Sequence, residues 1–174
     1  MSGIVEFRPK ISRGEALDLA AQYCAAGDTA AMLAGRAIKG GDFSPDHLRT
    51  IFKWKTGNRG KKRLCGNSDA EIRDALELAV LAREPRSVIA VLCGLSGVDT
   101  PVASAIATVI NPEKHTVLDF RALHALGCDA TDRSISFYLS YRSYCLALAA
   151  QWKISPRTLD RALWQWSKSQ SKTK

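Results

Sequence analysis

The sequence predicts an all-α globular protein with about nine short helices. Apolar residues recur at steps of three and four along most of the 174 residues, which is the period of a helix. No segment alternates apolar and polar residues for long enough to indicate a strand. Serine, glycine and proline signals for helix starts and stops divide the chain into short, uneven segments, a pattern that disfavours a simple bundle.

Three helices are expected in the first third of the chain. Ser12 and Glu15 have the spacing of a capping box, in which each side chain bonds the other residue's backbone N–H, and an apolar stripe follows them. Residues 28–39 form the second helix, which two glycines end. Residues 44–55 form the third, with serine at the N-cap and proline at the first helical position.

The rest of the chain provides six further helices. Ser68 and Glu71 repeat the capping-box spacing, and prolines open three of the other helices. An extended link at 115–118 separates two of the six. The expected starts are Ser68, Pro85, Thr100, Asp119, Arg133 and Ser155.

Residues 1–167 are expected to form a single helical domain, followed by a flexible basic tail at 168–174. No apolar run reaches the roughly 18 residues of a membrane span, and the N-terminus lacks the basic and apolar stretches of a signal peptide. The five cysteines contain no C-x-x-C pair, so we expect reduced thiols in the core, no metal site and no cofactor. These features predict a protein of the cytoplasm, such as the bacterial cytosol or nucleoid.

The charge of the chain favours an anionic partner. Lys and Arg number 25 and Asp and Glu 17, which gives a net charge of +8 and a pI of about 9.4. Nucleic acid is the first candidate partner, and an anionic membrane surface is the second. A run of six cations without a carboxylate comprises Lys53, Lys55, Arg59, Lys61, Lys62 and Arg63. Glycines interrupt this run, so its second half is expected to be a flexible loop, either simply solvated or following a phosphate backbone.

Residues 88–110 carry the most specific pattern in the chain. A short helix is followed by a tight turn around Gly97 and by a second helix from Thr100. The glycine permits a positive φ or a close approach of the backbone. The free N–H groups at the start of the second helix form an anion site that would suit a DNA phosphate.

Two motifs define this region: L-S-G-V-D with V-A-S-A-I at 95–99 and 102–106, and V-L-D-F-R at 117–121. Together they resemble the hairpin and the helix-opening aspartate of the helix-hairpin-helix (HhH-GPD) DNA glycosylase superfamily. The resemblance is close over residues 92–126 and loose over 159–164. It implies two helical lobes flanking a cleft, duplex or damaged DNA as the partner, and a role in DNA repair.

Three departures from the family pattern bear on activity. Bifunctional members carry a nucleophilic lysine two residues past the second glycine of the turn. This chain has Pro101 there, so lyase chemistry by that route is not expected. Asp99 replaces the second glycine, where it could repel phosphate, cap the 100–110 helix or help hold a cation that bridges to phosphate. The closely spaced cysteines of an iron–sulfur cluster are absent from the sequence.

The resemblance implies that Asp119 is the catalytic residue. A carboxylate near the sugar would stabilise the positive charge that develops as a base leaves, and it would orient the attacking water. An aspartate at this place is also a good N-cap, and the two roles are compatible. The implied DNA contacts are the six cations of the basic run together with Gly94, Gly97, Val98, Asp99, Thr100 and Ala103.

Three aromatic residues are candidates for a base pocket, each with a competing structural role. Trp54 either stacks on an extruded base or belongs to the core of the third helix. Tyr138 and Tyr141, at helical spacing, either line the pocket or belong to the core. His115, close to Asp119 in the sequence, is expected to be an ordinary surface or cleft histidine.

Three functions are compatible with these observations. The first is a monofunctional DNA glycosylase that removes a damaged or modified base. The second is a non-catalytic DNA-binding module of the same fold. The third is a helical protein-interaction domain whose basic face is incidental.

Overall fold

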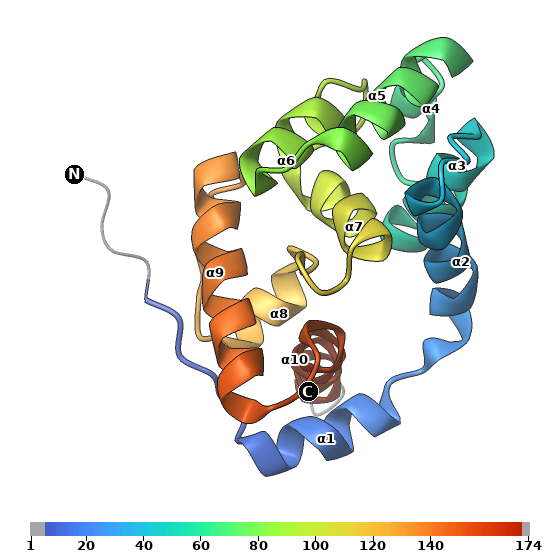
Figure 1. Ribbon diagram of the computed structural model, residues 1–174. Helices are drawn as coiled ribbons and strands as arrows, with labels where there is room; N and C mark the ends of the chain where they lie inside the picture. Colours follow the sequence, from blue (N-terminus) through green and yellow to red (C-terminus); the bar gives the residue numbers. More distant parts are fainter. Residues whose placement is uncertain (1–5, 172–174) are drawn as a thin grey trace.

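The computed structural model describes residues 6–171, and within them every regular element is a helix (Figure 1). The α-helices are α1 (Arg13–Gln22), α2 (Asp28–Lys39), α3 (Pro45–Thr56), α4 (Lys61–Leu64), α5 (Asp69–Leu81), α6 (Pro85–Cys93), α7 (Thr100–Ile110), α8 (Phe120–Ala125), α9 (Ile135–Trp152) and α10 (Pro156–Gln170). A short 3-10 helix, η1 (Ala25–Gly27), precedes α2. All nine helices expected from the sequence are present, and the all-α prediction is confirmed.

Local capping explains why the helix starts could be predicted. The Ser12 hydroxyl accepts a bond from the Glu15 N–H at 3.3 Å, and the Glu15 carboxylate accepts one from the Ser12 N–H at 2.7 Å. Ser68 and Glu71 form the same reciprocal pair at the start of α5. Each pair satisfies two backbone donors that a helix start otherwise leaves free.

The helices form two groups (Figure 1). Residues from both groups line a cleft between them. One group comprises α2 to α7; the other comprises α1, α8, α9 and α10, with α10 packed on α1, α8 and α9. Every residue of α7 except Pro101 is buried, and α7 contacts α2, α3, α6 and α9. Gly35 of α2 allows α7 to pack close to α2. Any side chain at this position would clash, because a Cβ would lie 2.1 Å from the Val109 carbonyl oxygen.

Tyr138 and Tyr141 belong to the core, so their assignment to a base pocket is wrong. Both side chains of α9 are fully buried. The Tyr138 hydroxyl lies 3.0 Å from His115 Nδ1, and the Tyr141 hydroxyl donates to the Val117 carbonyl oxygen at 2.9 Å. Their helical spacing therefore reflects a packed face of α9, and the hydroxyls satisfy polar groups of the 115–118 link.

His115 is buried rather than placed at the surface or in the cleft, and this makes stability sensitive to pH. Burial lowers the pKa of His115 to about 4. The unfolded chain binds this proton below about pH 6.5, whereas the folded chain does not, so acid favours unfolding. We expect the unfolding free energy to fall by up to about 3 kcal/mol between pH 6.5 and pH 4 from this group alone.

Urea unfolding of the wild type and of His115→Asn at pH 7, 5.5 and 4.5 measures this effect. The variant keeps a polar group near the Tyr138 hydroxyl but has nothing to titrate in this range. Its stability should therefore depend less on pH than that of the wild type. Parallel pH curves for the two proteins would contradict the assignment.

The structure corrects several local expectations. The second half of the basic run is not simply a loop, because Lys61–Leu64 form α4, with the buried Leu64 as its anchor. Helix α10 reaches Gln170, so residues 168–170 of the expected tail are helical. Not all thiols fill the core, since Cys24 and Cys65 are exposed.

Residues 1–5 and 172–174 lie outside the described residues. The prediction about a signal peptide at the N-terminus and the end of the predicted basic tail fall on these residues. Within residues 6–171, no helix combines the length and the apolar character needed to cross a bilayer.

Candidate active-site cleft

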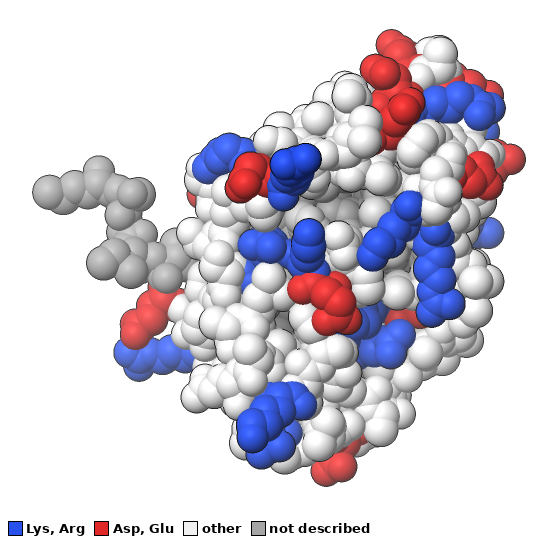
Figure 2. Space-filling view, viewed as in Figure 1, with Lys and Arg blue, Asp and Glu red and all other residues white. Residues whose placement is uncertain are grey.

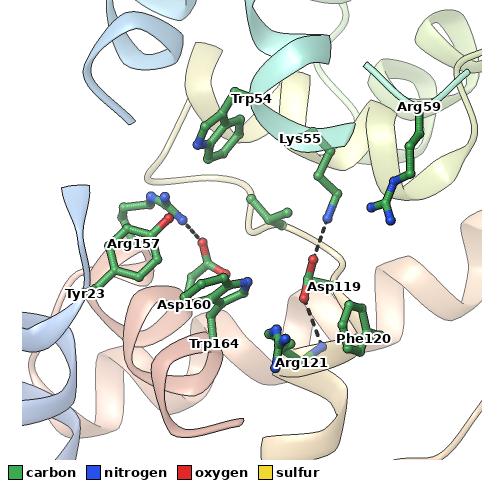
Figure 3. Close-up of a pocket in the computed structure, with 11 residues that line it drawn as sticks. Tyr23, Trp54, Lys55, Arg59, Asp119, Phe120, Arg121, Arg157, Asp160 and Trp164 are labelled. Atoms are coloured by element: carbon green, nitrogen blue, oxygen red, sulfur yellow. Dashed lines mark hydrogen bonds and ion pairs between the residues drawn. The ribbon is translucent and has the colours of Figure 1, made fainter. Parts of the chain in front are cut away.

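Two adjoining cavities lie between the two groups of helices. The first has a volume of about 370 Å³ and is lined by Tyr23, Trp54, Lys55, Arg59, Val117, Asp119, Phe120, Arg121, Arg157, Asp160 and Trp164 (Figure 3). The second has a volume of about 460 Å³ and is lined by Phe52, Lys55, Thr56, Arg59, Gly60, Arg63, Gly97, Asp99, Pro101, Val102, Leu118, Asp119, Phe120 and Arg133. Four residues line both: Lys55, Arg59, Asp119 and Phe120.

Asp119 lies where the two cavities meet, and it also caps α8. Its Oδ1 accepts a bond from the Arg121 N–H at 2.9 Å, which fixes the carboxylate at the helix start. Its Oδ2 faces Lys55 of α3, whose Nζ lies 2.8 Å away (Figure 3). The two side chains are 18% and 12% exposed, so the pair lies inside the cleft but remains reachable. Asp119 therefore both caps α8 and lines the cleft.

The hairpin turn and Asp119 line the same cavity, as the functional interpretation requires. Gly97 has a φ of +82°, and a Cβ there would lie 2.8 Å from the Leu64 backbone nitrogen. The close approach that this glycine allows is therefore to α4 of the same chain. Asn67 holds the turn from the other side, since its side-chain oxygen accepts from the Ser96 N–H at 2.8 Å.

Asp99 caps α7, which is one of the three roles considered for it. Its carboxylate accepts a bond from the Val102 N–H at 3.0 Å, at the start of α7. A negative charge therefore already occupies the helix end where a phosphate site was expected. Three other hairpin residues expected to touch DNA, Val98, Thr100 and Ala103, are buried and cannot reach a DNA strand as side chains, whereas Gly94 is exposed.

The six cations of the basic run separate into two sets. Lys55, Arg59 and Arg63 line the cleft cavities, whereas Lys53, Lys61 and Lys62 are exposed and line neither. On the face seen in Figure 2, Lys and Arg side chains are spread over both groups of helices, with Asp and Glu between them. Lys55, Arg59 and Arg63 are therefore the cations of the basic run that the fold brings to the cleft, and Lys55 is the one paired with Asp119.

Aromatic side chains form one wall of the first cavity (Figure 3). Tyr23 and Trp164 meet edge to face, with ring centroids 5.2 Å apart. The Arg157 guanidinium lies 5.4 Å from the Trp54 ring centroid and 5.7 Å from that of Tyr23. Trp54 is partly buried against the core and also faces the cavity, so both of its expected environments are present. Such a wall offers flat surfaces on which a planar ring could stack.

Asp28 does not line the cavity itself, but its carboxylate links residues of this aromatic wall. It is buried, and it accepts hydrogen bonds from the Tyr23 hydroxyl at 3.0 Å and from Trp54 Nε1 at 2.9 Å. Arg157 and Arg161 of α10 pair with its other oxygen. Burial alone would raise the pKa of Asp28, but Arg157 and the hydrogen bonds outweigh it and hold that pKa below its ordinary value.

A second carboxylate, that of Asp160, also lines the first cavity. It is buried and paired with Arg157 one helical turn away on α10 (Figure 3). Burial raises the pKa of Asp160 against the opposing effect of Arg157, and the nearby charge of Asp119 raises it further. Burial also raises the pKa of Tyr23 to about 12, which keeps its phenol neutral at ordinary pH.

Sequence reasoning missed the α10 side of the cleft. Arg157, Asp160, Arg161 and Trp164 follow one another at steps of three, one and three, so they share a helix face. A charged and aromatic face on an otherwise amphipathic helix was the available signal. Tyr23 and Asp28 carried no such pattern, because their roles arise only from contact with α10 and α3.

Comparisons of the chain with family models, curated proteins and solved structures give no match, so the functional assignment depends on the geometry of the cleft. Among residues 6–171, no three His, Cys, Asp or Glu side chains are gathered as metal ligands would be.

Proposed function

We propose that the protein is a DNA N-glycosylase, which removes a base from a nucleotide extruded from the duplex. The observation that supports this most strongly is the position of Asp119. Its carboxylate lies between an aromatic-walled cavity and a second cavity lined by the hairpin turn and arginines. The first cavity, at about 370 Å³, falls within the roughly 300–1,000 Å³ of small-molecule sites.

The proposed mechanism follows from this arrangement. An extruded base would enter the first cavity and stack on the wall that includes Trp54 and Tyr23. Its sugar would then lie beside Asp119, whose negative charge stabilises the oxocarbenium character that develops as the bond to the base breaks. Asp119 would also orient the water that completes the reaction. Arg59 and Arg63 would bind phosphates of the strand at the second cavity.

The non-catalytic DNA-binding module remains the second candidate function. Two observations favour it: Lys55 already neutralises part of the charge of Asp119, and Asp99 occupies the helix end that would otherwise attract a phosphate. A helical protein-interaction domain would account for the fold but gives the cleft charges no role.

A base-release assay separates these functions. The protein is incubated with duplexes that contain uracil or alkylated, oxidised, deaminated or hydroxymethylated bases, and abasic sites are then cleaved with alkali. Strand breaks at one or more of these bases support the glycosylase. DNA binding without breaks on any substrate favours the module, and the absence of DNA binding favours the protein-interaction domain.

The arginines of the cleft should set the salt dependence of DNA binding. We expect the double variant Arg59→Gln, Arg63→Gln to weaken binding to all sequences alike. Each lost phosphate contact should flatten the slope of log K against log salt by roughly 0.9. Fluorescence anisotropy at several salt concentrations measures the slope. Arg13→Gln, at an exposed arginine of α1 away from both cavities, is the matched control. An unchanged slope in the double variant would remove these arginines from the interface.

A further inference from the structure

A separate cavity lies where α6 packs on α5 and α7 (Figure 1). Its volume is about 520 Å³, and it shares no lining residue with the two cleft cavities, so the proposed function gives it no role. Much of its lining is apolar and comes from these three helices: Ala79, Val80, Val88, Ala107 and Ile110.

Three cations line this cavity without a carboxylate to balance them. Lys39 ends α2, Arg83 lies between α5 and α6, and Lys114 follows α7. Glu84 and Glu113 adjoin two of them in the sequence, but no Asp or Glu among residues 6–171 lines the cavity, and none of the three cations forms an ion pair there. The C-terminus of α7 adds only about half a negative charge, which the three cations outweigh.

His115 adds a directed hydrogen-bond donor to this cavity. The residue is buried, and its pKa of about 4 leaves the imidazole neutral at pH 7. Its Nδ1 lies 3.0 Å from the Tyr138 hydroxyl, for which the described residues provide no other acceptor. The hydroxyl therefore donates to Nδ1, and the imidazole proton is on Nε2.

The Nε2 of His115 forms no hydrogen bond in the described part of the chain. It is not sealed inside the protein either, because Arg157 Nε is the one fully buried side-chain nitrogen or oxygen atom without a partner in that part. Since the ring lines the cavity, we infer that this N–H is available to an acceptor there.

Asn111 gathers the polar groups at one end of the cavity, which it also lines. Its side-chain oxygen accepts from Lys39 Nζ at 3.4 Å. Its backbone oxygen accepts from the N–H groups of Lys114 and His115, at 3.0 and 3.1 Å. Two ammonium groups and the imidazole N–H are therefore carried by neighbouring residues, next to an apolar lining.

We propose that this cavity binds a small organic anion, in which a carboxylate or phosphate group is joined to a short apolar chain or ring. The anionic group accepts hydrogen bonds from Lys39, Lys114 and the His115 N–H, and the apolar part packs on the side chains of α5, α6 and α7. The volume falls within the roughly 300–1,000 Å³ of small-molecule sites.

A crevice filled with water alone would explain these features less well. Water could satisfy the His115 N–H, but it would leave the apolar lining wet, including Leu81, which is 67% exposed. A purely apolar ligand would cover that lining but leave the N–H without an acceptor, which is costly. A ligand with both an anionic and an apolar part satisfies both requirements.

Calorimetric titration with small probes tests the proposal. The full chain is titrated with sodium octanoate and with octyl phosphate, below their micelle concentrations, and with 1-octanol as the neutral probe. We expect one molecule of at least one anion to bind per chain, and octanol to bind at least about 10-fold more weakly because it lacks the charge-assisted hydrogen bonds. Acetate and inorganic phosphate, which lack the apolar part, should also bind at least about 10-fold more weakly. The tighter anion identifies the headgroup.

Variants at exposed positions locate the binding site without disturbing the core. Lys114→Gln should weaken binding of the anion by about 10-fold, and Lys114→Glu should weaken it further through repulsion. Arg73→Gln, at an exposed arginine of α5 outside the cavity, is the matched control. The bound anion should also protect Lys39 and Lys114 from acetylation by acetic anhydride, as mapped by mass spectrometry, while the exposed Lys62 stays reactive.

Three results would overturn the inference: no saturable binding of either anion below ~1 mM, equal affinity for octanol and the anions, or unchanged binding in Lys114→Glu. Thermal melting of the variants identifies any loss of folding. None of these measurements involves DNA, so their outcome leaves the proposed function of the cleft to its own assay.

Discussion

Asp119→Asn should lose base release by at least about 100-fold while the protein stays folded. The amide oxygen of asparagine can still accept the bond from the Arg121 N–H, so the cap of α8 is retained. The negative charge is lost, however, and with it the stabilisation of a cationic sugar. The Lys55 ammonium would then face the sugar without compensation, which adds to the loss.

Single-turnover rates on whichever damaged duplex the wild type cleaves measure this effect, with protein in excess so that binding does not limit the rate. Asp74→Asn, at an exposed aspartate of α5, is the matched control and should retain the wild-type rate. A wild-type rate in Asp119→Asn would show that the carboxylate plays no part in bond cleavage.

Asp28→Asn should destabilise the protein by about 3–5 kcal/mol, which is the cost of breaking a buried charge pair on one side. Asp28 is 2% exposed and pairs with Arg157 and Arg161. The two arginines lose their shared partner, because both donate to Oδ2, where asparagine that keeps its oxygen toward Tyr23 and Trp54 places an NH2 group. The aromatic wall of the first cavity should loosen as a consequence.

Urea unfolding near pH 7 measures the loss, with Asp46→Asn as the control. Asp46 is also paired with an arginine, Arg49, but its side chain is 82% exposed, so its loss should matter much less. Because the pKa of Asp28 is lowered in the folded protein, its stabilisation is complete above the unfolded value of about 3.9 and is lost as the pH falls below it. Equal destabilisation in the two variants would contradict the role of Asp28.

The helices could be predicted because their signals are local. The hydroxyls of Ser12, Ser68 and Ser155 each accept a bond from the backbone N–H three residues later. Such contacts can be predicted because they depend only on residues that are neighbours in the sequence. Helix α4 could not be predicted in the same way. It has four residues, starts at a glycine without a side-chain cap, and is held by the buried Leu64 and by the close approach of Gly97.

The candidate site could be predicted only in parts. Asp119 and Lys55 were each singled out, but 64 residues separate them in the sequence and nothing local indicates that they pair. Periodicity placed Tyr138 and Tyr141 on one face of a helix without indicating whether that face meets core or cavity, and both are buried. Side chains that a fold brings together across distant helices leave no signal in a single sequence.

A crystal structure of the protein with a duplex that contains a tetrahydrofuran abasic nucleotide tests the central claim most directly. We expect the abasic sugar to be rotated out of the helix into the cleft, with its C1′ within roughly 3–4 Å of the Asp119 carboxylate. Phosphates of the same strand should lie against Arg59 and Arg63. DNA bound to another face of the protein, or a sugar that stays within the duplex away from Asp119, would contradict the claim.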